Sequence, residues 1–282
     1  MQVELWQLEL TFAALRICGS GPQSRLMAQL AEVGQQSPVV VVAGTVPERY
    51  VLIDGYRRVE ALHKLGRDTV DAIVLSLPIP EALVWHRRQE AARRRTAIED
   101  GWLLRELCEG HGLSGAEVAR RLGRSDSWVS RRLALVRALP QRVQDLVRSG
   151  ALSAQATMKY LVPLARGKAE DCERLAENLA GQRVSVRQMH KLYVAWRQSD
   201  AETRQRLCDH PMLFLSASAE AQPPADGNAE VLADLHALEG ICRRLARKLR
   251  QDGGDKPHGR AVRDAWGAAQ QSFDALFEWL RC

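Results

Sequence analysis

Residues Leu113–Val136 read LSGAEVARRLGRSDSWVSRRLALV and predict two short helices joined by a tight turn. Ser114 and Glu117 have the spacing of a capping box, which starts a helix. Gly123 can adopt the positive φ that such a turn requires, and Ser125 can cap the second helix. This pattern is typical of a helix-turn-helix.

The second predicted helix has an inner side with Trp128, Val129, Leu133 and Val136, and a polar outer side that carries arginines. A DNA major groove admits one α-helix, whose small polar side chains let the backbone approach base edges while arginines reach phosphates or guanine. We therefore expect DNA contacts from Ser114, Arg124, Ser125, Asp126, Ser127, Ser130, Arg131 and Arg132. The alternative is an ordinary helical hairpin whose basic side is only solvated.

The positive charge of the chain is concentrated in one segment. Residues Arg87–Arg148 contain 14 arginines and 8 acidic residues, which accounts for the whole formal net charge of +6. Such a local excess favours binding to nucleic acid or to an anionic membrane. No lipidation signal or strongly apolar amphipathic segment accompanies it, so we expect double-stranded DNA as the partner and no membrane.

The composition is that of a soluble globular protein with two or three domains. The chain has 282 residues, of which 46% are apolar and 26% charged. Its apolar runs are too short to span a bilayer and its first residues do not resemble a secretory signal, so we expect a cytoplasmic location. The six cysteines are scattered singly, without the spacing of a metal site, and we expect no metal ligand or catalytic residue among them.

The first 84 residues predict a small mixed α/β domain. Strands are expected at 39–42, 50–53 and 70–75, and helices at 24–34 and 57–65. Between strand and helix, IDGYRR places Gly55, Arg57 and Arg58 at a helix N-terminus, which suits a phosphate. Alternatively, Gly55 only turns the chain and the two arginines pair with acidic neighbours.

Three sequence motifs follow one another along the chain. They are GQQSPVVVV (residues 34–42), YVLIDGYRRVEALHKLG (50–66) and LSGAEVARRLGRSDSWVSRRLALVRALP (113–140). In this order the segments resemble the ParB family of plasmid and chromosome partition proteins. The resemblance implies a ParB-type N-terminal domain, a helical domain that binds a DNA site, and a homodimer. It also implies a nucleotide, cytidine triphosphate (CTP) with Mg²⁺, bound at Gly55, Arg57 and Arg58.

The chain departs from the family in the nucleotide motifs. Tyr56 replaces the usual acidic residue, and WHRRQEAARRR (residues 85–95) stands where a Glu-Asn box with a following arginine is expected. Since a bound Mg²⁺ needs oxygen ligands, the chain either binds nucleotide without hydrolysing it or does not bind it. A CTPase activity is therefore implied only by the resemblance, and at altered residues.

The C-terminal part predicts a helical hairpin after a small, polar linker. Two apolar stripes repeat at spacings of three and four residues, and each is a narrow seam of the kind that packs against another helix. They comprise Val231, Leu235, Leu238, Cys242, Leu245 and Leu249, then Val262, Trp266, Ala269, Phe273, Leu276 and Leu280. We expect the hairpin to pair with a second copy, or else to dock on the body of the protein. The carboxyl-terminal module of the family commonly includes strands, so an all-helical one is a further departure.

These expectations combine into an α+β chain with four parts. They are a ParB-like domain at 1–84, a helical DNA-binding domain at 85–206 with the helix-turn-helix at 114–136, a linker at 207–229 and the hairpin at 230–282. We expect a sequence-specific DNA-binding protein of the ParB type, associated with nucleoid or plasmid and acting in plasmid, chromosome or mobile-element partition with a ParA-type ATPase. The alternatives are a nucleotide-dependent switch or phosphotransferase that DNA directs, and a transcriptional regulator with the same helix-turn-helix.

Overall fold

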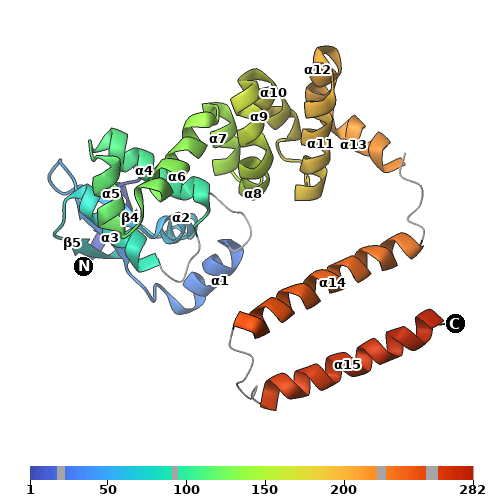
Figure 1. The fold of residues 1–282 in the computed structure, drawn as a ribbon. Coiled ribbons are helices and arrows are strands. Elements are labelled where there is room, and N and C mark those ends of the chain that lie inside the picture. Colours follow the sequence, from blue (N-terminus) through green and yellow to red (C-terminus); the bar gives the residue numbers. More distant parts are fainter. Residues whose placement is uncertain (18–22, 91–94, 221–226, 252–259, 282) are drawn as a thin grey trace. The chain divides into compact units, whose positions relative to one another are not determined.

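The computed structural model describes residues 1–17, 23–90, 95–220, 227–251 and 260–281. The contacts divide the chain into two compact units, residues 1–219 and 220–282. The first unit is an α+β structure that holds the sheet and the helix-turn-helix, and the second is helical (Figure 1). Among the described residues, no helix has both the length and the apolar composition needed to cross a membrane.

A five-stranded mixed sheet forms the N-terminal part of the first unit, in the order β1-β5-β3-β4-β2. The strands are β1 (Gln2–Glu4), β2 (Leu8–Glu9), β3 (Val39–Ala43), β4 (Tyr50–Asp54) and β5 (Thr69–Leu75). β3 is antiparallel to β4 and parallel to β5. The three predicted strands are confirmed, whereas β1 and β2 are too short for their residues to show a strand period.

Both sides of the sheet are covered, as expected for the β-branched run in β3. On one side, helices α1 (Gln23–Val33) and α2 (Tyr56–Lys64) pack over Val39 and Val41. On the other side, Val42 belongs to a core that includes α3 (Ile79–Gln89) and the helix-turn-helix. The predicted domain limit at residue 84 lies inside α3, whose Leu83 and Val84 are buried in that shared core.

Helices make up the rest of the first unit. They are α4 (Ala97–Arg105) with a π-helical turn (Glu106–Gly110), α5 (Gly115–Leu122), α6 (Asp126–Ala138), α7 (Gln141–Arg148), α8 (Ala154–Ala156) with a second π-helical turn (Thr157–Leu161), α9 (Val162–Gly167), α10 (Ala169–Leu179), α11 (Val186–Gln198), α12 (Ala201–Asp209) and α13 (Pro211–Glu220). α4 crosses α6 at Gly101, where a Cβ atom would lie 2.7 Å from the Arg132 carbonyl oxygen. This close contact holds α6 against the body.

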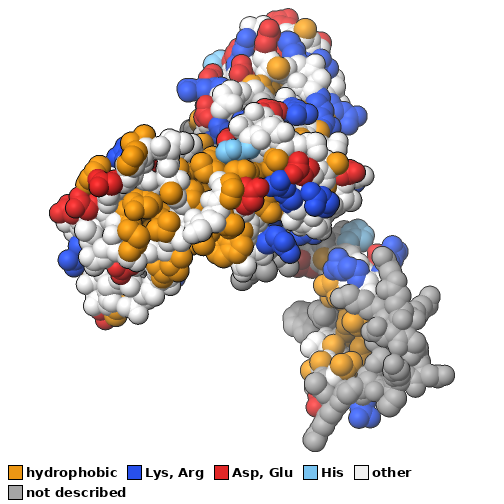
Figure 2. Space-filling model, turned by 90° about the vertical axis from the view of Figure 1, so that its left-hand side faces the viewer, with side chains coloured by type: hydrophobic (Ala, Val, Ile, Leu, Met, Phe, Trp, Pro, Cys, Tyr) orange, Lys and Arg blue, Asp and Glu red, His pale blue; other side chains and the backbone are white. Residues whose placement is uncertain are grey.

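The second unit contains two long helices, α14 (Gly227–Gln251) and α15 (Arg260–Arg281). They lie where the two helices of the hairpin are predicted, although the expected linker at 207–229 also contains helix α13 and the start of α14. The described seam residues are mostly exposed, and Trp266, the largest of them, is 58% exposed. Figure 2 shows apolar side chains gathered along one side of this unit. Residues 221–226 of the expected linker, and the side chains of Leu249, Leu276 and Leu280, lie outside the described residues.

Candidate nucleic-acid interface

Local hydrogen bonds form the two helices of the helix-turn-helix. The Ser114 hydroxyl accepts from the Glu117 backbone N–H at 3.2 Å, and the Ser125 hydroxyl accepts from the Trp128 backbone N–H at 3.2 Å. Gly123 ends α5 with φ +63°, as predicted. The second hydrogen bond of the expected capping box, from the Ser114 backbone N–H to the Glu117 side chain, does not form. The Glu117 carboxylate accepts instead from Arg121.

The inner and outer sides of α6 agree with the prediction, except at Trp128. Val129, Leu133 and Val136 are buried in the core. Trp128, which is expected to face inward, packs against the core that contains Val129 and Leu133 but is only half-buried. Its ring lies 4.5 Å from the Arg132 guanidinium and 5.5 Å from that of Arg124, so it supports the charged surface.

The candidate DNA-contacting residues lie on or beside the outer side of α6. The exposed ones are Ser114, Arg124, Ser125, Asp126, Ser127, Ser130 and Arg131. Arg132 is half-buried against Trp128. Burial lowers the pKa of Arg132, and the neighbouring charges of Arg131 and Arg124 lower it further. Cations therefore crowd together at this end of α6.

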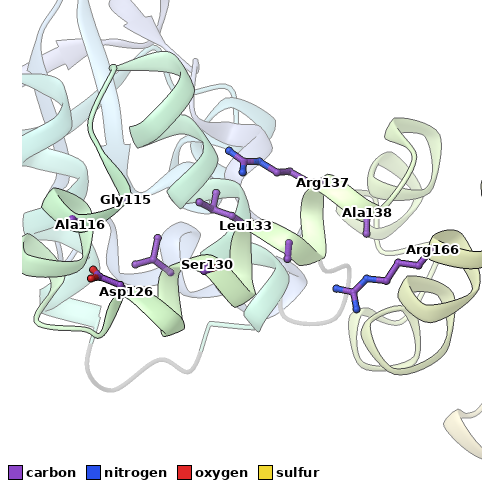
Figure 3. A pocket seen from close by; sticks show the side chains of 10 residues that line it. Gly115, Ala116, Asp126, Ser130, Leu133, Arg137, Ala138 and Arg166 are labelled. Carbon is purple, nitrogen blue, oxygen red and sulfur yellow. The ribbon is translucent and has the colours of Figure 1, made fainter.

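A cavity of about 620 Å³ runs along one flank of α6 (Figure 3). Ser130 and Asp126 line it from α6, and Gly115 and Ala116 line it from the start of α5. Arg137 and Arg166 line it beside the C-terminal half of α6. Sequence reasoning missed Arg166, because α9 is brought to this surface only by the packing of the helical body.

A second cavity, of about 310 Å³, lies on another flank of α6. Its lining comes from the end of α3, the α5–α6 turn and α6, and consists of Arg87, Arg88, Leu122, Gly123, Arg124 and Trp128. The Arg87 guanidinium donates to the two carboxylate oxygens of Asp100 at 2.8 and 3.4 Å. This ion pair ties α3 to α4.

The arginines of segment 87–148 divide into two groups, so the local charge is lower than the sequence suggests. Ion pairs with carboxylates engage Arg87, Arg95, Arg121, Arg137, Arg142 and Arg148. Within the described part of the chain, no ion pair with a carboxylate is formed by Arg88, Arg105, Arg120, Arg124, Arg131 or Arg132. Arg93 and Arg94 lie outside the described residues. Three of the unpaired arginines, Arg124, Arg131 and Arg132, adjoin or belong to α6.

The IDGYRR segment forms the predicted strand, turn and helix. Gly55 has φ +105°, and a Cβ atom there would lie 2.5 Å from a Val39 methyl carbon, so only glycine fits. Arg58 pairs with Asp54 at 2.9 Å and donates to two backbone carbonyls, in agreement with the expectation that an acidic neighbour engages it. Arg57 differs, since it donates to the Gln23 side chain and its Nη2 atom is buried without a partner.

A buried polar cluster that the sequence did not reveal lies beside this turn. The Glu90 carboxylate accepts from Arg16 at 2.9 Å, lies 3.3 Å from His86 Nε2, and accepts from Arg95. Burial alone would raise the pKa of Glu90. The His86 hydrogen bond and the charges of Arg95 and Arg16 outweigh burial and hold that pKa far below its usual range. One carboxylate thus joins the N-terminal segment, the end of α3 and a residue just before the start of α4.

Two family models match this chain. The model of the ParB N-terminal domain matches residues 21–90, and the model of the ParB HTH domain matches residues 95–198. Together they match more than half of the chain. It belongs to the ParB family.

Relatives of this ParB-family chain include several nucleoid occlusion proteins. That of Bacillus cereus (strain AH187) is 31% identical over 129 residues, which are 44% of this chain and 43% of the relative. That of Lysinibacillus sphaericus (strain C3-41) is 36% identical over 118 residues, which are 40% of this chain and 38% of the relative. That of Shouchella clausii (strain KSM-K16) is 27% identical over 176 residues, covering 60% of each chain. The matched region thus spans less than half the length of the first two relatives.

Two solved structures of the Caulobacter crescentus partitioning protein ParB, both C-terminally truncated, are similar to this chain. The complex with CTP-gamma-S is 22% identical with a TM-score of 0.31, and it covers 64% of this chain and 97% of that one. The complex with the centromeric parS site is 21% identical with a TM-score of 0.32, and the match covers 69% of this chain and 98% of that one.

The residues of this ParB N-terminal domain fit a phosphate group better than they fit a magnesium ion. The unpartnered Arg57 Nη2 atom and the start of α2 after Gly55 are suited to an oxyanion. The nearby carboxylates of Asp54 and Glu90 are instead engaged by guanidinium groups. Tyr56, which stands in place of an acidic residue, donates its hydroxyl to the Leu52 carbonyl, and burial raises its pKa. No group of three or more potential metal ligands occurs among the residues with described positions.

Proposed function

We propose that this chain is a sequence-specific DNA-binding protein of the ParB type. The observation that carries the proposal is the exposed, polar outer side of α6, with Ser127, Ser130 and Arg131, inside a ParB HTH domain. Short side chains let α6 lie close to the floor of a major groove, where Arg131 can reach a guanine edge. The remaining candidate residues, Ser114, Arg124, Ser125, Asp126 and Arg132, lie where they would position the backbone of the duplex.

The proposed biological role is the partition of plasmids, chromosomes or mobile elements. Membership of the ParB family supports this role, as does the similarity to nucleoid occlusion proteins. In this role the protein associates with nucleoid or plasmid in the cytoplasm and acts with a ParA-type ATPase.

A homodimer is part of the proposal. The apolar seams of α14 and α15 are exposed in the single chain, with Val231, Leu235, Val262, Trp266 and Phe273 each at least 40% exposed. Exposed apolar stripes of this kind are typical of surfaces that pair with another helix. Pairing of two chains through this unit would present two copies of α6 to two half-sites of one duplex.

Genome-wide crosslinking of DNA to the protein tests the proposal. A sharp sequence motif under the peaks is expected, with flanking spread if the protein loads and slides in partition. Isolated peaks at promoters would favour the transcriptional regulator. Enrichment without a shared motif would overturn sequence-specific binding by α6.

A nucleotide-responsive switch in the ParB N-terminal domain is a second candidate, favoured by the buried, unpartnered Arg57 Nη2 atom. CTP is the proposed ligand, bound at Gly55, Arg57 and Arg58, with Mg²⁺ carried by the nucleotide. Isothermal titration of the full chain with CTP and with ATP tests it. Heat with CTP that Arg57→Gln abolishes supports the switch. If neither nucleotide gives heat while DNA binding is intact, this candidate is removed.

A further inference from the structure

The cavity between the end of α3 and the helix-turn-helix brings together arginines from the ParB N-terminal domain and from the ParB HTH domain of the same chain. Arg87 and Arg88 come from the N-terminal domain, whereas Arg124 comes from the turn before α6. We call this cavity the arginine cleft. None of its lining residues is acidic. Asp100 compensates Arg87, but it does not contact Arg88 or Arg124 in the described structure.

Arg88 and Arg124 are exposed, and no carboxylate pairs with them in the parts of the chain that the structure describes. Two such cations at one opening repel each other unless an anion lies between them. The cavity volume of about 310 Å³ leaves room for an oxyanion with its hydration. The charge and the space therefore both indicate a negatively charged ligand.

Trp128 arranges the cations on this side of α6. The guanidinium groups of Arg124 and Arg132 lie 5.5 and 4.5 Å from the centre of its ring. The Arg132 Nε atom is buried and has no hydrogen-bond partner in the structure. Because the ring already carries two guanidinium groups, it offers poor support for a stacked base, which disfavours a nucleobase ligand.

We propose that the arginine cleft binds a phosphate of the DNA backbone beside the major groove that α6 occupies. The inference rests on the proposed function, because it takes α6 as the helix in the groove. A helix in a major groove has a phosphate backbone along each flank. On one flank α6 has the cavity with Arg137 and Arg166, and the arginine cleft supplies cations at another. Helix α3 of the N-terminal domain thereby becomes part of the DNA-binding surface.

Salt-dependent binding of the full chain to DNA tests this proposal. The probe is a 30-base-pair duplex of mixed sequence, with affinity measured by fluorescence anisotropy from 50 to 200 mM salt. Each phosphate contact contributes about 0.9 to the slope of log K against log salt. The double variant Arg88→Gln and Arg124→Gln should therefore lower the magnitude of the slope by about 1 to 2. The matched control is the double variant Arg25→Gln and Arg67→Gln, which removes the same charge at exposed positions that line neither cavity. Its slope should stay close to that of the unaltered chain.

The outcomes separate this inference from the function on which it rests. If the unaltered chain shows no salt-dependent binding, the DNA-binding function fails and the inference fails with it. A steep slope in the unaltered chain, changed equally by both double variants, overturns the inference alone. Thermal stabilisation by pyrophosphate that Arg88→Gln and Arg124→Gln abolish, with the slope for DNA unchanged, would assign the cleft to a soluble anion and also overturn it. Circular dichroism of each variant confirms that the helices are retained.

Discussion

Arg131 is exposed on the outer side of α6 and pairs with no carboxylate in the described structure. Its exposed neighbours Ser127 and Ser130 are short, so Arg131 has the longest side chain of the three. This position distinguishes it from Arg132, which packs against Trp128 at 4.5 Å. We expect Arg131 to contact a base and Arg132 to support the surface.

Arg131→Ala should weaken binding to the duplex recovered by crosslinking about 10- to 100-fold, since losing a bidentate base contact costs about 1 to 3 kcal/mol. Binding to mixed-sequence DNA should weaken much less. Anisotropy with both duplexes measures the difference, and Arg67→Ala serves as an exposed control. An equal loss on both duplexes would make Arg131 a phosphate contact.

Gly55→Ala should destabilise the sheet of the N-terminal domain. A Cβ atom at this position, with φ +105°, would lie 2.5 Å from Val39 Cγ1. We expect a loss of more than about 2 kcal/mol, because steric overlap adds to the cost of a left-handed residue. The control is Gly66→Ala, with φ +68° and no atom within 4 Å of the added carbon, which should cost only about 1 kcal/mol. Thermal unfolding of both variants compares them, and equal losses would contradict the overlap.

The Glu90 cluster connects the N-terminal segment, α3 and the start of α4. Glu90 lies against Arg16, His86 and Arg95, and its side chain is only 8% exposed. The folded pKa of Glu90 lies below its unfolded value, so the ionised carboxylate stabilises the fold at neutral pH. That contribution is lost as the pH falls below about 4.5 towards the folded pKa.

Glu90→Gln should lower the thermal midpoint at pH 7, because it removes the nearest counter-charge of Arg16 and Arg95, which are both largely buried. The difference between the variant and the unaltered chain should shrink as the pH falls from 5 to 3. Calorimetric scans across this range measure it. A difference that is constant with pH would show that folding does not lower the pKa of Glu90.

Helix α15 carries an exposed apolar seam, through which we propose that two chains pair. Trp266→Asp places a charge within that seam, where pairing would bury it at high cost. We expect the dimer to dissociate at micromolar concentration, as measured by sedimentation velocity. Gln271→Asp, which lies on the opposite side of α15 by helical geometry, should leave the dimer intact. Dissociation by both variants, or by neither, would contradict pairing through this seam.

The proposed DNA-binding surface and the exposed apolar seams lie in different compact units of the chain. Residues 1–219 contain the sheet, the helix-turn-helix and the arginine cleft, whereas residues 220–282 contain the exposed seams. In the proposed function, DNA contact and chain pairing therefore belong to different units.

A truncated chain that ends at Ala219 should be folded and monomeric. Its affinity for a duplex with two half-sites should be about 100-fold lower, because linking two binding modules raises affinity by roughly that factor or more. Its affinity for a single half-site should be unchanged. Gel filtration with light scattering and anisotropy measure the two properties. Undiminished affinity for the two-site duplex would show that pairing through the second unit does not support DNA binding.

The sequence by itself determined the local elements of this protein. Ser114, Gly123 and Ser125 mark the ends of the two helices, because caps and turns depend on hydrogen bonds between residues close in the chain. The β-branched run in β3 likewise indicated a strand buried on both sides. The sequence motifs in these segments, taken in their order along the chain, indicated the resemblance to the ParB family.

Only the tertiary structure decided which charges are available. Arg121 pairs with Glu81, 40 residues away, and Arg142 pairs with Glu177, 35 residues away, so counting arginines overstated the free positive charge. The same packing placed Arg88 beside Arg124, and Arg166 beside α6. Ion pairs and cavities join residues that are distant in the chain, and their geometry is set by how helices pack and not by any local pattern.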